Sequence, residues 1–257
     1  MGKLVVVHSF RGGTGKSNIT ANLAALLACQ GNRVGIVDTD IQSPGIHALF
    51  NLAPEHFKFA LNDYLWKRCR VEEAAYDVSD IVLQHQPDAH GRLYLIPASM
   101  RTGEITRILQ EGYDVGLLNN GFQQFMERLE LDYLLIDTHP GVNEETLLSA
   151  AISDVLLLIL RPDRQDYQGT AIMVELARQL DVPHMLMLIN KAINQKDFAA
   201  LEQRVASIYG VEVAGVIPLT EEIAVLGSTD LFCLLHPGHA MTKALLSVIG
   251  QITQTHP

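Results

Sequence analysis

The chain has 257 residues, of which 48% are hydrophobic and 19% are charged, and its formal net charge is -10. This length suits one large α/β domain or two small ones with a sizeable core, and the high apolar fraction excludes a disordered chain. The excess of acidic residues argues against wholesale binding to nucleic acid or to an anionic membrane.

The cysteines and the apolar runs bear on where the protein works. The three cysteines lie far apart and form no CxxC pair, which gives no support to a disulfide framework or a local metal cluster. The charge-free apolar run Val155–Leu160 is far shorter than a membrane span of about 20 residues. We therefore expect a cytoplasmic protein with reduced thiols and do not expect integral membrane insertion.

Short apolar runs alternate with segments of helical periodicity along the chain. The runs are continuous and rich in Val, Ile and Leu, as in strands buried on both faces. They predict strands at Leu4–Val7, Arg33–Val37, Leu93–Ile96, Tyr133–Ile136, Val155–Leu160, Met185–Ile189 and Val213–Ile217. The periodic segments predict helices at Lys16–Gln30, Val115–Glu130, Glu144–Ala151, Tyr167–Leu180, Lys196–Tyr209 and Thr242–Gln254.

This alternation predicts an α/β fold with a doubly wound, mostly parallel sheet and helices on both of its faces. Residues 51–91 are the least regular and predict short surface helices and a loop. Since no repeat or linker interrupts residues 1–257, we expect a single domain.

A glycine-rich segment, His8–Asn18, joins the first predicted strand to the first predicted helix. Its glycines let backbone N–H groups converge on phosphates, and the helix N-terminus adds positive potential. Lys16 is expected to reach the β- and γ-phosphates, and the Ser17 hydroxyl to ligate Mg²⁺. The segment predicts a nucleotide site whose contacts come from Gly12, Gly13, Thr14, Gly15, Lys16, Ser17 and Asn18.

The order Arg11-Gly-Gly-x-Gly-Lys-Ser resembles the deviant Walker A loop, K-G-G-x-G-K-[ST], of the MinD/ParA ATPases, which have the P-loop NTPase fold. In that family the first lysine crosses a dimer interface to the nucleotide of the other subunit. Here Arg11 takes its place, and an arginine can donate to two phosphate oxygens at once. The resemblance implies catalytic roles for Lys16 and, in trans, for Arg11, which we expect to find an acceptor only on the other subunit's nucleotide.

Three aspartates extend the resemblance. Asp38 and Asp40 follow the second predicted strand and resemble the D-x-D of switch I, although D-x-D alone is more often a solvated turn. By this match Asp38 holds a water on Mg²⁺ and Asp40 orients the attacking water. The segment Leu134–Gly141 resembles Walker B running into switch II, with Asp137 delivered to the metal shell. For His139 we prefer a passive loop residue to a phosphate sensor.

Two further segments concern the base. Asn190 resembles the family's asparagine that reads adenine, because an amide can both donate to and accept from the adenine edge. A turn residue that closes the strand is the alternative for Asn190. The segment Val216–Thr220 resembles the loop that packs on the adenine ring, with Pro218 as its contact. No guanine-reading N-K-x-D motif occurs, so ATP is expected in preference to GTP.

The surface that the protein binds is less clear from its residues. The stripe of Met241, Leu245, Val248, Ile249 and Ile252 has helical spacing and little positive charge, which favours core packing over a membrane-surface helix. The basic cluster Lys67–Arg70 could contact DNA phosphates, although a solvated helix end is preferred. The turn Gln42–Gly45 resembles one in related iron–sulfur carriers, but the paired cysteines of those proteins are missing.

The resemblance as a whole implies a Mg²⁺-dependent ATP hydrolase that dimerises on ATP and positions or partitions a cargo. We expect turnover to be slow and stimulated by a protein partner that the sequence does not identify. An ATP-gated scaffold or regulatory protein with little turnover is one alternative. A ParA-like protein that binds DNA in the presence of ATP is another.

Overall fold

The computed structural model describes residues 2–193 and 197–255. Within them, eight strands form one sheet in the order β3-β4-β2-β5-β1-β6-β7-β8. Neighbouring strands are parallel except for β3 and β4. Their bounds are β1 Lys3–His8, β2 Arg33–Asp38, β3 Tyr76–Asp77, β4 Arg92–Ile96, β5 Tyr133–Asp137, β6 Val155–Leu160, β7 Met185–Ala192 and β8 Glu212–Pro218.

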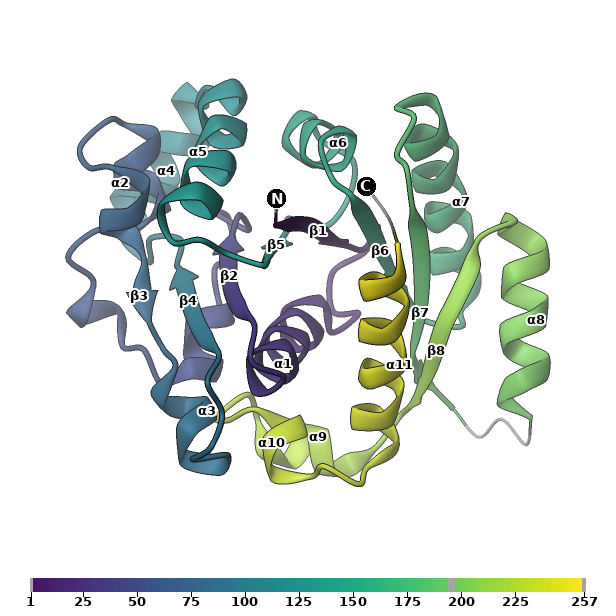
Figure 1. The fold of residues 1–257 in the computed structure, drawn as a ribbon. Helices are drawn as coiled ribbons and strands as arrows, with labels where there is room; N and C mark the ends of the chain where they lie inside the picture. The colour runs from purple at the N-terminus through teal and green to yellow at the C-terminus, as the bar shows by residue number, and fades with distance from the viewer. Residues whose placement is uncertain (1, 194–196, 256–257) are drawn as a thin grey trace.

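Helices cover both faces of the sheet, as Figure 1 shows. One apolar core lies under α1 (Lys16–Cys29), α3 (Asp80–His85), α10 (Phe232–Leu235) and α11 (Ala240–Gln254). The other lies under α2 (Leu61–Leu65), α4 (Thr102–Glu111), α5 (Val115–Arg128), α6 (Glu144–Ala151), α7 (Arg164–Gln179) and α8 (Phe198–Tyr209). A short helix, α9 (Glu221–Leu226), follows β8, and single 3₁₀ turns occupy Ile46–Phe50, Pro54–His56 and Val71–Ala74.

The predicted fold class is confirmed, and all seven predicted strands are present with slightly different ends. The sequence missed β3, which has two residues and pairs antiparallel to β4 within the irregular segment 51–91. It also missed α4, whose side chains are largely exposed and of which only Ile108 is buried. The sequence predicts a helix over Lys196–Tyr209. Lys196 lies outside the described residues, and the structure has this helix, α8, from Phe198 to Tyr209.

The strand order decides where the candidate site lies. Strand β5 inserts between β2 and β1, so Asp38 at the end of β2 is paired in register with Asp137 at the end of β5. The glycine-rich segment follows the carboxyl end of β1. Strand β1 is the neighbour of β5 on the side opposite β2. Loops at the carboxyl ends of adjacent parallel strands form a crevice, which is where such sheets bind ligands.

The last helix is part of the core, as its apolar stripe predicted. Met241, Leu245, Val248, Ile249 and Ile252 of α11 are all buried. The Lys3 ammonium at the start of β1 donates to the carbonyl oxygens of Ile252 and Thr255, each at 2.6 Å, so the start of β1 lies beside the end of α11. Across residues 2–193 and 197–255, no helix combines the length and the apolar character that crossing a membrane requires.

Candidate functional site

The glycine-rich loop between β1 and α1 turns through two left-handed residues. Gly13 has φ of 74° and Gly15 has φ of 93°, a region that favours glycine. A Cβ atom on Gly15 would lie 2.6 Å from Asn190 Nδ2, so close packing also requires glycine there. Gly15 caps α1 without a side-chain hydrogen bond, which leaves amides of the first helical turn free to bind an anion.

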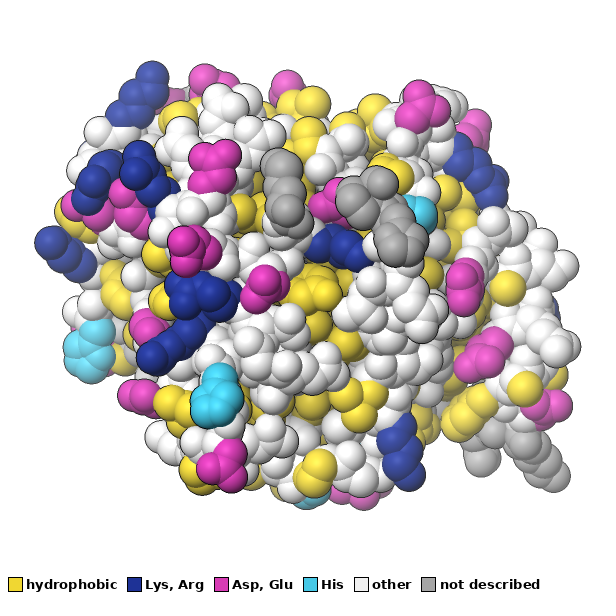
Figure 2. Space-filling model, viewed as in Figure 1, with side chains coloured by type: hydrophobic (Ala, Val, Ile, Leu, Met, Phe, Trp, Pro, Cys, Tyr) yellow, Lys and Arg dark blue, Asp and Glu magenta, His cyan; other side chains and the backbone are white. Residues whose placement is uncertain are grey.

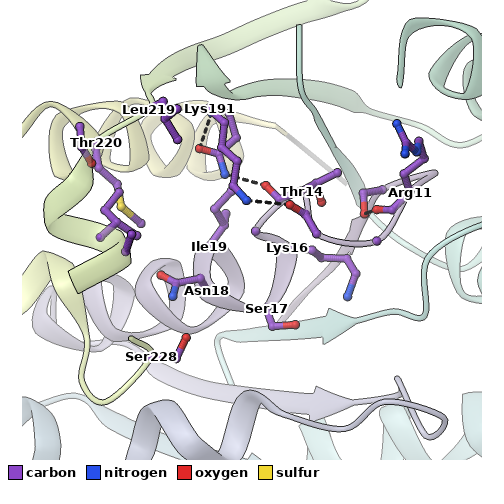
Figure 3. A pocket seen from close by; sticks show the side chains of 18 of the residues that line it. Arg11, Thr14, Lys16, Ser17, Asn18, Ile19, Lys191, Leu219, Thr220 and Ser228 are labelled. Atoms are coloured by element: carbon purple, nitrogen blue, oxygen red, sulfur yellow. Dashed lines mark hydrogen bonds between the residues drawn. The ribbon is translucent and has the colours of Figure 1, made fainter. Parts of the chain in front are cut away.

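The loop forms one wall of a cavity of about 490 Å³ (Figure 3). All the predicted site residues line it except Asp38 and Asp137, which are buried next to it; the lining members are Arg11, Gly12, Gly13, Thr14, Gly15, Lys16, Ser17, Asn18, Asp40, Asn190 and Pro218. Lys16 and Ser17 lie toward one end of the cavity, and Leu219, Thr220 and Ser228 lie toward the other.

A buried ion pair stands between the loop and the sheet. The Lys16 ammonium lies 2.8 Å from Asp137 Oδ1, and both side chains are buried. Burial raises the pKa of Asp38, and the neighbouring carboxylate of Asp137 raises it further. Asp137 Oδ2 is buried without a hydrogen-bond partner in the described residues.

These groups fit a hard cation such as Mg²⁺, which prefers oxygen ligands and would relieve the repulsion between the two carboxylates. Among the described residues no three His, Cys, Asp or Glu side chains cluster as a complete metal site. A hydroxyl such as that of Ser17, together with water or phosphate oxygens, would complete the ligand shell, as is usual for Mg²⁺.

His139 contacts a predicted site residue, a partner that the sequence did not suggest. Its Nδ1 lies 2.7 Å from Asp40 Oδ1, and both side chains are mostly buried. Asp40 Oδ1 also accepts a hydrogen bond from the backbone N–H of Ser43 at 3.1 Å. The prediction missed this contact because Asp40 and His139 are 99 residues apart and no local pattern links them.

Asn190 lines the cavity, but its side-chain amide forms hydrogen bonds within the protein. Its Nδ2 donates to the carbonyl oxygen of Thr14 at 2.7 Å, and its Oδ1 accepts from the backbone N–H of Lys191 at 2.8 Å. The Lys191 ammonium in turn donates to the carbonyl oxygen of Gly13 at 2.7 Å. Asn190 therefore braces the glycine-rich loop and retains one amide hydrogen for a further partner.

Several residues at the far end of the cavity carried no signal in the sequence. They belong to α1, to the end of β7, to the segment after β8 and to the start of α11, and they are Ile19, Lys191, Ile223, Ala224, Gly227, Ser228 and Met241. Ile19 and Met241 looked like ordinary core positions, because helical spacing does not distinguish a side chain that lines a cavity from one that fills a core.

Arg11 differs from its prediction. Its guanidinium Nη1 lies 3.7 Å from Asp163 Oδ1 and 3.8 Å from Asp166 Oδ1, at the N-terminus of α7. The expectation that Arg11 finds an acceptor only on another subunit is therefore wrong for the single chain. These distances exceed a hydrogen bond and the Arg11 side chain is 38% exposed, so the pairing is weak and can be exchanged.

The basic cluster Lys67–Arg70 is largely neutralised within the chain. Arg68 lies 2.7 Å from both Asp63 and Glu104, and Arg70 lies within 3.4 Å of Glu72 and Glu73. On the face drawn in Figure 2, acidic and basic side chains are interspersed and form no continuous basic surface.

Known proteins resemble this chain over most of its length. The CobQ/CobB/MinD/ParA nucleotide binding domain family matches residues 5–231. The chain belongs to this family. An ATP-binding protein of Methanocaldococcus jannaschii is 24% identical over 96% of the chain and 86% of its own length. An iron-sulfur cluster carrier protein of Aquifex aeolicus is 24% identical over 98% of the chain and 67% of its own length.

Solved structures extend the likeness to the fold. The septum site-determining protein MinD of Pyrococcus horikoshii, in complex with Mg-ADP, superposes with a TM-score of 0.79 at 17% identity and covers 99% of this chain and 97% of its own. The fold of a MinD/ParA nucleotide-binding domain thus extends over nearly the whole chain.

Proposed function

We propose that this protein, as a single cytoplasmic domain, binds ATP with Mg²⁺ in the cavity and hydrolyses it. The observation that carries the proposal is the convergence of the glycine-rich loop, Lys16 and the buried pair Asp38 and Asp137 at one edge of the sheet. The free amides at the start of α1 suit phosphates, and the cavity is roomy enough for a nucleotide at about 490 Å³.

Each residue of the site has a chemical task in this proposal. Lys16 leaves Asp137 or shares it with the β- and γ-phosphates, and its charge offsets the charge that develops on them. Ser17, Asp38 and Asp137 would hold Mg²⁺, which when bound neutralises phosphate charge. Asp40, at the cavity wall, orients the attacking water.

The base would occupy the end of the cavity near Pro218, Leu219 and Ser228. The remaining amide hydrogen of Asn190 is suited to an acceptor on the adenine edge. We propose ATP rather than GTP on this basis.

We further propose that ATP joins two copies of the chain and that hydrolysis releases them, with a protein partner that stimulates turnover and a cargo that the dimer positions. The weak pairing of Arg11 with Asp163 and Asp166 supports this, because a cation held at 3.7 and 3.8 Å can transfer to a better acceptor such as a phosphate. The ion pairs of Arg68 and Arg70 give the DNA-binding alternative no support.

The decisive test is nucleotide binding by calorimetry with Mg²⁺ present. Lys16→Ala should abolish ATP binding, whereas Lys67→Ala, outside the cavity, is the matched control and should bind as the wild type does. Wild-type affinity in Lys16→Ala would refute the site, and equal affinities for ATP and GTP would refute the adenine assignment.

Hydrolysis is tested separately. Asp40→Ala should keep ATP binding, slow phosphate release and accumulate any ATP-bound dimer. Unchanged turnover in this variant would show that Asp40 is only a turn residue.

A further inference from the structure

Three consecutive residues at the end of β5 tie three different elements together. Asp137 pairs with Lys16 of α1, and Thr138 Oγ1 lies 2.8 Å from His8 Nδ1 at the end of β1. His139 then reaches across to Asp40 in the segment that follows β2. The first two contacts hold the glycine-rich loop and the sheet together, whereas the third acts on a side chain at the cavity wall.

The hydrogen bonds of Asp40 are distributed unequally between its two oxygens. Oδ1 accepts from His139 Nδ1 at 2.7 Å and from the backbone N–H of Ser43 at 3.1 Å. In the part of the chain that the structure describes, no hydrogen bond reaches Oδ2. We assign the donor of this hydrogen bond to the ring nitrogen Nδ1 of His139, since a carboxylate oxygen is an acceptor.

The contact is not needed to hold these two segments together. The backbone N–H and the hydroxyl of Thr39 both donate to the carbonyl oxygen of Asp137, at 2.9 and 3.1 Å. These bonds already join the segment after β2 to the end of β5. What His139 adds is an orientation for the Asp40 carboxylate, whose side chain is only 12% exposed.

We propose that His139 is a positioning residue for the hydrolysis of ATP. Its Nδ1–H holds Oδ1 of Asp40 and so presents Oδ2 to the cavity as the acceptor for the attacking water. This inference rests on the proposed function and deepens it, because it assigns the group that orients Asp40. A misplaced catalytic group costs up to about a hundredfold in rate, which sets the expected size of the effect.

The test uses the full-length protein and two substitutions of His139. His139→Ala should lower kcat about 10- to 100-fold and leave the ATP dissociation constant within about twofold. His139→Asn should recover most of the loss, because an amide N–H can donate from nearly the same position as Nδ1. His85→Ala, in α3 and away from the cavity, is the matched control and should match the wild type.

A double-mutant cycle shows whether His139 acts through Asp40. In an Asp40→Ala background, His139→Ala should reduce kcat no further. An equal loss in both backgrounds, a normal kcat in His139→Ala, or no recovery in His139→Asn would each overturn the inference.

A second measurement does not depend on turnover. Nitrogen-15 spectra of the histidine rings, recorded without nucleotide, should show hydrogen on Nδ1 of His139 in the wild type and its redistribution in Asp40→Ala. If the wild type hydrolyses no ATP, the proposed function fails by itself. If ATP is hydrolysed and needs Asp40 but the ring spectrum is insensitive to Asp40→Ala, only the role of His139 fails.

Discussion

The close approach between Gly15 and Asn190 yields a prediction that can be worked from the structure. Gly15→Ala keeps the backbone charge and polarity of the loop but places a methyl group 2.6 Å from Asn190 Nδ2. The amide must move, and its 2.7 Å hydrogen bond to the carbonyl oxygen of Thr14 is then lost. Gly13→Ala provides the matched control, since Gly13 has a similar φ of 74° and no atom within 4 Å of the added Cβ.

The magnitude has two parts. A left-handed conformation costs alanine about 1–2 kcal/mol at either position. At Gly15 the lost hydrogen bond adds about 1 kcal/mol. A chain of this size loses about 2–4 °C of Tm per kcal/mol. We therefore expect Gly15→Ala to unfold about 2–4 °C below Gly13→Ala, and both to unfold below the wild type.

The assay is thermal unfolding of the nucleotide-free protein, followed by circular dichroism and by calorimetry. An Asn190→Ala background removes the clashing amide, so the difference between the two alanine variants should largely disappear there. Equal Tm values for Gly13→Ala and Gly15→Ala in the wild-type background would refute the contact between Gly15 and Asn190.

Three further predictions use other contacts. Gly169→Ala puts a Cβ 2.0 Å from the ring of Phe10, so thermal unfolding should show the free energy of unfolding lowered by about 1–3 kcal/mol. Adding Phe10→Ala should relieve this destabilisation, and a stabilised Gly169→Ala would contradict the packing. Arg11→Ala breaks only weak ion pairs, so the stability of the single chain should change by less than about 0.5 kcal/mol. The ATP-dependent dimer should weaken at least about tenfold in analytical ultracentrifugation, and identical dimer constants would remove the role in trans. Burial, with repulsion from Lys16 and His139, lowers the pKa of His8 to about 3. Below about pH 6.5 the unfolded chain therefore binds a proton that the buried neutral ring does not, and the free energy of unfolding falls as the pH drops from about 6.5 toward 3. This loss in the free energy of unfolding amounts to up to about 5 kcal/mol, and denaturant titrations of His8→Asn should show a smaller loss over the same pH range. The same pH dependence in His8→Asn and the wild type would contradict the assignment.

Local sequence determined most of the elements of this fold and the phosphate end of its candidate site. Continuous runs such as Val155–Leu160 have few stable arrangements other than a strand buried on both faces. The glycine-rich loop is equally local, because the positive φ of Gly13 and Gly15 and the start of α1 lie within a few residues. Where the local signal was weak, as in the two-residue β3 and the exposed α4, the sequence did not predict the element.

The tertiary structure alone decided which distant side chains meet. Apolar runs do not encode the order of strands, yet it is the insertion of β5 between β2 and β1 that places Asp137 beside both Asp38 and Lys16. The same order brings His139 within hydrogen-bonding distance of Asp40. These residues are 99 positions apart, and no pattern in the sequence indicated that they are partners. Arg11 likewise met Asp163 and Asp166 because α7 begins beside the loop, in a strand-to-helix connection far along the chain. Periodicity indicates only which face of a helix or strand is buried. Ion pairs and hydrogen bonds between distant residues depend on how whole elements pack against one another, and for this reason the chemistry of the site needed the structure.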